Sequence, residues 1–99
     1  MFIKNYIKAY EKYVAKNGEE QLLPGVPFNQ KQLFFINLAQ TWCSKSTAEF
    51  KINEIKKDPH TLPPFRILGI TSNFEGFSEA FNCRPKQKNN REKKCSIWW

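Results

Sequence analysis

Residues 33–43 are apolar on nearly every side when wound as a helix, and they limit the possible folds more than any other stretch. The start of this helix is well signalled, because Asn29 can cap it and Gln32 can reach back to the capping residue. A helix that is apolar all round is normally buried all round. A chain of 99 residues has little material with which to surround it, which indicates that the chain belongs to a larger domain.

A second helix is predicted before this one. Apolar residues recur at three- and four-residue steps over residues 2–14 and form a single stripe, as in an amphipathic helix. Gly18, after Asn17, can adopt the left-handed conformation that commonly closes a helix. Pro24-Gly25 then predicts a turn in the connection to the apolar helix.

Two further helices and one extended segment complete the prediction, which is a mainly α fold with about four helices. The helix after the apolar one should begin at Ser46 or Thr47 and end before Pro59. Its apolar residues, which should be buried, are Phe50, Ile52 and Ile55. Residues 65–71 form an apolar, strand-like run and are predicted to be extended, and Ser72 and Glu75 should open the last helix. The apolar face of that last helix contains Phe74, Phe77, Ala80 and Phe81.

A proline-rich loop before the extended segment carries the only histidine of the sequence, His60. Proline restricts its own backbone and that of the preceding residue, so this loop is stiff and suited to holding a side chain in one position. Asp58 is close enough in sequence to orient the imidazole. Arg66 is a permanent cation whose planar donors suit carbonyl or carboxylate oxygens. On these residues alone, a capped helix end followed by a loop is the simpler interpretation.

The three cysteines, Cys43, Cys83 and Cys95, are an odd number, and no two of them have the spacing of a zinc or redox site. Two of them can pair and leave one over, or each can pair with a cysteine elsewhere. One histidine and scattered cysteines cannot supply zinc ligands at the usual spacings, so no metal site is predicted within this chain. The start of the sequence has no long apolar run, which predicts neither a signal peptide nor a membrane span.

The formal charge of +7 suggests acidic partners, and the C-terminal tail is the most basic part of the chain. Residues 84–95 contain six Lys or Arg residues and a single acid, Glu92. Such a tail can bind an anionic surface or a nucleic acid. It has no aromatic residues among the basic ones and no nucleic-acid motif, so we expect no nucleic-acid partner. A small basic binding protein that uses this tail is the alternative to the function considered next.

A series of motifs runs through the whole chain. They are Asn17-Gly18-Glu19-Glu20-x-x-Leu23-Pro24-Gly25, Gln32-Leu33-Phe34-Phe35, Ala39-Gln40-x-Trp42-Cys43, Asp58-x-His60-x-x-x-x-Phe65-Arg66, Ser72-Asn73, Phe77-x-x-Ala80-Phe81-x-Cys83 and Glu92-Lys93-Lys94-Cys95-x-x-Trp98. In order and spacing, this series resembles the C-terminal end of the neprilysin-like zinc metallopeptidases, which include neprilysin and the endothelin-converting enzymes. The resemblance implies that residues 1–99 are the C-terminal segment of a larger α-helical metallopeptidase catalytic domain.

The resemblance also implies roles for particular residues. In this family zinc is held by two histidines of an HExxH helix and a glutamate from a later helix, all absent from this sequence, so zinc is expected in the full-length parent and not in this chain alone. His60 matches the residue that donates a hydrogen bond to the transition-state oxyanion, and Asp58 matches its acidic partner. Arg66 matches an arginine that binds a substrate carbonyl. Trp42 and Thr41 match residues lining the pocket for a large apolar side chain just after the scissile bond, although the family usually has an aliphatic residue where Thr41 stands.

The implied function is that of a metalloendopeptidase portion that cleaves peptides on the amino side of large apolar residues. Its implied partners are the peptide substrate and the remainder of the peptidase domain, and the isolated chain is expected to be inactive. The cysteines matching Cys43, Cys83 and Cys95 bond to upstream cysteines in this family, which implies an oxidising extracellular setting. The parent would be a secreted protein or the ectodomain of a single-pass membrane protein. Two departures from the family pattern are Arg91, where proline is usual, and the additional Trp99.

Overall fold

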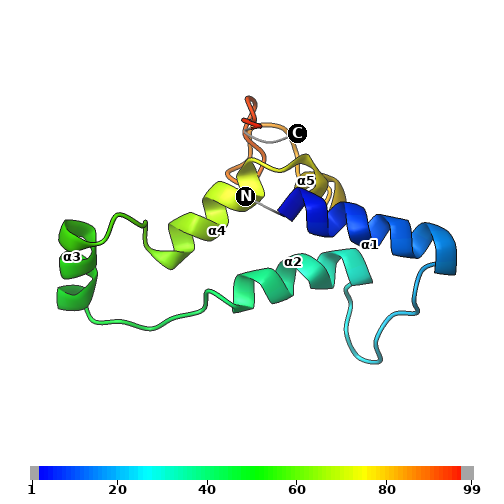
Figure 1. Cartoon of the computed structure of the whole chain (residues 1–99), viewed down its shortest axis with the longest axis horizontal. Coiled ribbons are helices and arrows are strands. Elements are labelled where there is room, and N and C mark those ends of the chain that lie inside the picture. The colour runs from blue at the N-terminus through cyan, green and yellow to red at the C-terminus, as the bar shows by residue number, and fades with distance from the viewer. Residues whose placement is uncertain (1–2, 97–99) are drawn as a thin grey trace.

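The computed structural model of the chain describes residues 3–96, and all regular secondary structure in this range is helical. The helices are α1 (Ile3–Asn17), α2 (Gln30–Gln40), α3 (Ala48–Lys57), α4 (Pro63–Ser72) and α5 (Glu75–Ala80) (Figure 1). The mainly α fold predicted from the sequence is therefore confirmed. Phe2 and the terminal Ile97-Trp98-Trp99, which were included in the sequence predictions, lie outside the described residues.

A small core forms where α1, α2 and α5 meet. Its buried apolar side chains are Ile3 and Ile7 of α1 and Phe35 of α2. The ring of Phe35 meets the ring of Phe77 edge to face, with centroids 5.3 Å apart. Partly buried residues packed against this core include the predicted apolar face of the last helix, Phe74, Phe77, Ala80 and Phe81. The placement of that apolar face is thus confirmed.

Local signals in the sequence explain where α1 ends and where α2 begins. The side chain of Asn29 accepts the backbone N–H of Gln32 at 2.9 Å, and the side chain of Gln32 accepts the backbone N–H of Asn29 at 3.0 Å. These two hydrogen bonds form the predicted capping box. At the end of α1, Gly18 has a φ of 81° and donates its N–H to the carbonyl of Val14 at 2.7 Å, as predicted for a glycine that closes a helix.

Helix α4 contradicts the extended segment predicted for residues 65–71. The apolar, partly β-branched sequence favoured a strand, but Pro63 and Pro64 occupy the first two positions of a helix. Proline is well tolerated there, because its φ is already helical and the N–H that it lacks has no partner in the first turn. The helix continues with Arg66, whose backbone N–H donates to the carbonyl of Leu62 at 3.2 Å.

The continuation of α4 also changes the predicted role of Ser72. This residue ends α4, and α5 begins at Glu75 without a side-chain cap, so the prediction was right for Glu75 and wrong for Ser72. Ser72 is only 1% exposed, and its backbone carbonyl accepts the N–H of Arg91 in the C-terminal tail at 3.3 Å. Of the two predicted starts of α3, Thr47 is the one used: its hydroxyl accepts the backbone N–H of Phe50 at 3.1 Å.

Helix α3 lies apart from the other helices and buries none of its residues (Figure 1). The sequence predicted burial of Phe50, Ile52 and Ile55, but their exposed fractions are 53%, 52% and 68%. The prediction failed because no other described segment covers this helix. For the same reason α2 is not enclosed as its composition predicted, and Phe35 is its one buried residue.

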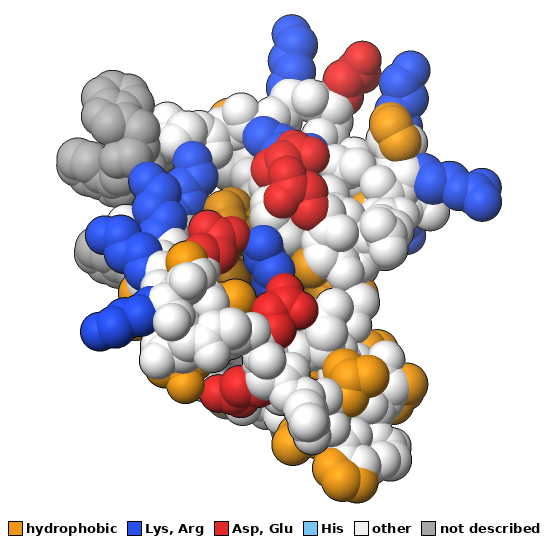
Figure 2. All heavy atoms as spheres, turned by 90° about the vertical axis from the view of Figure 1, so that its right-hand side faces the viewer, with side chains coloured by type: hydrophobic (Ala, Val, Ile, Leu, Met, Phe, Trp, Pro, Cys, Tyr) orange, Lys and Arg blue, Asp and Glu red, His pale blue; other side chains and the backbone are white. Residues whose placement is uncertain are grey.

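The size of the molecule reflects these uncovered surfaces. Its radius of gyration is 15.8 Å, against roughly 13 Å for a compact domain of this length. Its accessible surface is 8305 Å², whereas a compact protein of this mass exposes roughly 5,900 Å². Figure 2, which faces the end of the molecule opposite to α3, shows that hydrophobic side chains are exposed there as well. Within residues 3–96 no helix is long and apolar enough to cross a membrane.

When the 99-residue chain is made alone, we expect it to aggregate or to bind a hydrophobic dye such as anilinonaphthalene sulfonate. The exposed apolar residues of α3, together with the apolar residues of α2 that are only half-buried, are the physical reason. Replacing Ile55 with lysine should reduce dye fluorescence, while replacing the exposed Lys56 with glutamine should not. A monomer that melts sharply and ignores the dye would contradict this expectation.

Candidate functional site

Asp58 and His60 contact each other twice in the loop between α3 and α4. Asp58 ends α3 by donating its backbone N–H to the carbonyl of Glu54 at 2.8 Å, and its extended backbone then leads the chain away from the helix. Asp58 Oδ1 accepts the backbone N–H of His60 at 2.8 Å and lies 2.7 Å from His60 Nδ1. The geometry of the ring places Nε2 on the side of the imidazole away from Asp58. The His60 side chain is 63% exposed, so a ligand can reach it.

The backbone N–H of His60, and then its ring, hold the pKa of Asp58 below its ordinary value of 3.8. Hydrogen bonds to the ionised form are the main cause, and they favour the carboxylate over the acid. Asp58 is therefore negatively charged at neutral pH and can hold a proton on His60 Nδ1.

The pKa of Asp58 can be measured directly, because it is the only aspartate in the sequence. Carbon-13 NMR of aspartate-labelled chain should give one carboxyl resonance that titrates below 3.8. The contact between Asp58 and His60 therefore stabilises the folded chain at pH values above the pKa that Asp58 has in the unfolded chain. This contribution is lost as the pH falls through the lower pKa that Asp58 has in the folded chain. The variant His60→Ala removes the ring but keeps the backbone N–H, so the midpoint of the Asp58 titration should rise part of the way towards 3.8. Lys57→Ala serves as the control and should leave this midpoint unchanged. An unchanged midpoint in His60→Ala would contradict the contact.

A groove with a volume of about 650 Å³ adjoins the His60 loop. Thr61, the residue after His60, forms part of its lining, and the groove also contains Trp42 and Arg66. Apolar walls are added by Leu38, Phe65 and Ile70. The guanidinium carbon of Arg66 lies 4.3 Å from the centroid of the Trp42 ring, within the range of a cation–π interaction. The structure thus brings together two residues that the sequence analysis had singled out separately.

Thr41, the other residue predicted to line a specificity pocket, lies outside the described lining of this groove. It caps the C-terminal end of α2, and its hydroxyl donates to the carbonyl of Asn37 at 3.2 Å. The cysteines are unpaired within the described part of the chain: Cys43 and Cys95 are exposed, and Cys83 is half-buried. Their pairing with cysteines outside this chain stays a prediction.

The donor groups of residues 3–96 do not fit a zinc site. Nowhere in this range do three His, Cys, Asp or Glu side chains come together as a set that could hold a metal ion. Asp58 and His60 form only a pair, and they are engaged with each other.

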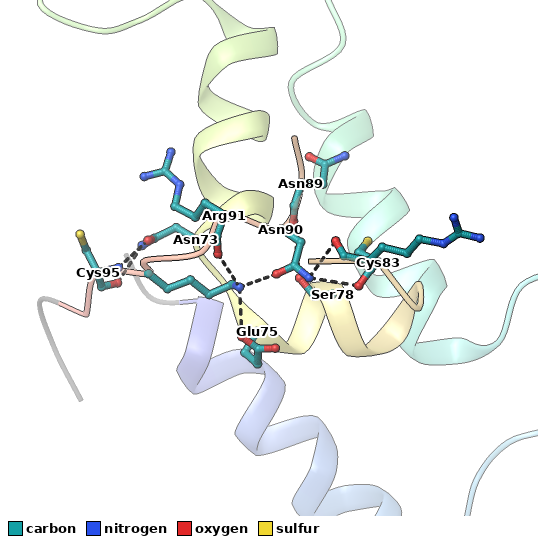
Figure 3. A network of polar contacts seen from close by, with 10 residues as sticks. Asn73, Glu75, Ser78, Cys83, Asn89, Asn90, Arg91 and Cys95 are labelled. Atoms are coloured by element: carbon teal, nitrogen blue, oxygen red, sulfur yellow. Dashed lines mark hydrogen bonds and ion pairs between the residues drawn. The ribbon is translucent and has the colours of Figure 1, made fainter. Parts of the chain in front are cut away.

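The basic tail is held against the start of α5 by an ion pair to Glu75 (Figure 3). Lys94 Nζ lies 3.1 Å from Glu75 Oε2 at the start of α5, and it donates to Asn90 Oδ1 at 2.5 Å and to the carbonyl of Arg91 at 3.0 Å. Asn90 is itself buried. One of the basic residues of the tail is thus used within the chain, which the sequence analysis had not foreseen.

Two further contacts make the tail a wall of the groove. The side chain of Asn73 donates to the backbone carbonyl of Cys95 at 2.7 Å and accepts the N–H of Cys95 at 2.6 Å (Figure 3). Lys4 Nζ donates to Ser96 Oγ at 2.8 Å. All four residues line the groove that contains Arg66. The Ser72-Asn73 motif was the one sign in the sequence of a role for Asn73.

Comparison with known proteins gives a match between residues 4–97 and the model of peptidase family M13. Neprilysin of Homo sapiens is 52% identical over 91 residues, which cover 92% of this chain and 12% of neprilysin. Membrane metallo-endopeptidase-like 1 of Mus musculus is 42% identical over 96 residues, 97% of this chain and 12% of that protein. Endothelin-converting enzyme 1 of Bos taurus is 42% identical over 96 residues, 97% of this chain and 13% of that protein. The chain therefore spans about an eighth of the length of these relatives.

Proposed function

Because the chain belongs to peptidase family M13, we propose that residues 1–99 form the C-terminal segment of the catalytic domain of a neprilysin-like zinc metalloendopeptidase. The observation that carries this proposal is the match over residues 4–97, nearly the whole chain. The exposed apolar residues of α3 and the half-buried apolar residues of α2 support it, because the remainder of such a domain would provide the missing neighbours.

In this proposal His60 stabilises the transition state of peptide hydrolysis. Attack of water on the scissile carbonyl places negative charge on the carbonyl oxygen, and a hydrogen-bond donor aimed at that oxygen lowers the barrier. The contact with Asp58 supports this role, because the carboxylate holds a proton on Nδ1 and stabilises the doubly protonated ring, in which Nε2 also donates. Nε2 of this doubly protonated ring is then the donor to the oxyanion.

Arg66 positions the peptide by binding a backbone carbonyl of the substrate. Its place in the groove supports this role, as does the absence of an ion pair to Arg66 within residues 3–96. The aromatic wall provided by Trp42 and Phe65 suits a large apolar side chain. We therefore propose cleavage on the amino side of large apolar residues, with Thr41 at the edge of the same pocket in the complete enzyme.

Zinc, the metal of this family, would be held by residues outside this chain and would supply an activated water molecule when bound. We further propose that Cys43, Cys83 and Cys95 pair with cysteines in the remainder of the protein. Such pairing requires an oxidising compartment, so the parent would be an extracellular enzyme, either secreted or anchored by a single membrane span.

The alternative function, a small basic binding protein, is less well supported. It depends on the tail residues 84–94, of which Lys94 is already bound to Glu75 and Asn90. On the face of the molecule in Figure 2, Lys and Arg side chains project at separate places with acidic side chains among them, and they form no single continuous patch there.

The proposal can be tested in a chimera in which residues 4–97 of this chain replace the matching segment of human neprilysin. The variant Arg66→Met should raise KM about tenfold or more, because a charge-assisted hydrogen bond is lost from the bound substrate. Lys86→Met, in the exposed tail, is the matched control and should leave KM within about twofold. Steady-state kinetics on a short apolar peptide provide the measurement. An unchanged KM in Arg66→Met would remove the substrate-binding role.

A further inference from the structure

We infer that Trp42 is a positioning residue for Arg66: the face of its indole ring holds the guanidinium in place and leaves the donors at its edges free for substrate. The inference rests on the proposed substrate-binding role of Arg66. It adds a role for Trp42 that differs from lining a specificity pocket, because it concerns the backbone of the substrate and not its side chain.

The backbones of Trp42 and Arg66 are both held in place by local structure. Trp42 lies in a turn just after α2, where its backbone N–H donates to the carbonyl of Ala39 at 3.0 Å. Arg66 lies in the first turns of α4, whose start is set by two prolines. With both backbones fixed, the guanidinium carbon lies 4.3 Å from the ring centroid. Both residues are half-buried, which strengthens the attraction between the cation and the ring relative to an exposed pair.

The chemistry of the contact suits a residue that must bind a carbonyl. A carboxylate partner would accept the N–H donors in the plane of the guanidinium and so compete with the substrate. An aromatic ring attracts the cation through its face and uses none of those donors. Within residues 3–96 no acid forms an ion pair with Arg66, so the Trp42 ring is what holds the guanidinium in this part of the chain.

This role predicts a pattern that a pocket wall would not produce. A wall of the specificity pocket affects only substrates whose large side chain touches it. A residue that positions Arg66 affects every substrate, because every peptide presents the carbonyl that Arg66 binds. Loss of the ring should therefore weaken the binding even of a peptide with alanine just after the scissile bond.

The experiment compares two peptides, with phenylalanine or alanine after the scissile bond, in the active-site-titrated neprilysin chimera. Trp42→Leu should raise KM for the alanine peptide about fivefold, whereas Trp42→Phe, which keeps an aromatic face, should stay within about twofold. In the Arg66→Met background, Trp42→Leu should have no further effect on the alanine peptide, because the group that it positions is gone.

A second measurement keeps the fold intact. Fluorinated tryptophan introduced at position 42 preserves the shape of the ring and weakens the negative charge of its face, so KM for the alanine peptide should rise with each added fluorine. An unchanged KM across the fluorinated series, or independent effects of Trp42→Leu and Arg66→Met, would overturn the inference while leaving the role of Arg66 intact. If Arg66→Met itself leaves KM unchanged, the proposed function of Arg66 fails and the inference fails with it.

Discussion

Replacing His60 with alanine in the chimera should lower kcat by about a hundredfold or more and change KM little. The hydrogen bond from Nε2 is made mainly to the charged oxygen of the transition state, so its loss does not weaken ground-state binding. Replacing Asp58 with asparagine should lower kcat less, because the donor remains but its orienting carboxylate is gone. Lys88→Ala, an exposed change in the tail, is the control and should leave both constants nearly unchanged.

The measurement must separate catalysis from folding. Asp58 and His60 also hold the turn between α3 and α4, so His60→Ala will lose some stability whatever its role in catalysis. Titrating active sites with a tight-binding inhibitor gives kcat per folded molecule. If His60→Ala keeps its full turnover per titrated site, His60 merely stabilises the loop and its catalytic assignment is wrong.

The 99-residue chain on its own should cleave no peptide at all. Catalytic zinc sites in proteins use three protein ligands, and residues 3–96 bring no such set together. The purified chain, incubated with zinc and a short apolar peptide, should match a blank reaction in a fluorescence-release assay, while the chimera under the same conditions should be active. If the purified chain cleaved the peptide in a zinc-dependent reaction, and phosphoramidon inhibited that cleavage, this expectation would be wrong.

Features encoded by neighbouring residues were predictable from the sequence. The capping box of Asn29 and Gln32 and the glycine that ends α1 depend on contacts within one helical turn. The contact between Asp58 and His60 spans two residues, and the sequence placed it correctly within reach. The resemblance to the family rested on short motifs that occur in the same order and spacing as in the family. The match over residues 4–97 confirms this resemblance.

Features that depend on distant or missing neighbours were not predictable. Burial of Phe50, Ile52 and Ile55 was inferred from their apolar character, but no described segment lies against them. The segment that forms α4 was predicted to be extended because β-branched residues favour strands. The structure shows a helix instead, with two prolines in its first two positions, where proline favours a helix start. The contact between Trp42 and Arg66 joins segments far apart in the chain, and no periodic pattern in the sequence predicts it.

The measurement that tests the central claim most directly is kcat/KM of the chimera that carries residues 4–97 of this chain in place of the matching segment of human neprilysin. If the chain is the C-terminal segment of such a catalytic domain, its His60 and Arg66 should complete the active site. The chimera should then cleave an apolar peptide with kcat/KM within about tenfold of unmodified neprilysin. A chimera that folds and binds a metal-directed inhibitor but has no measurable activity would contradict the claim.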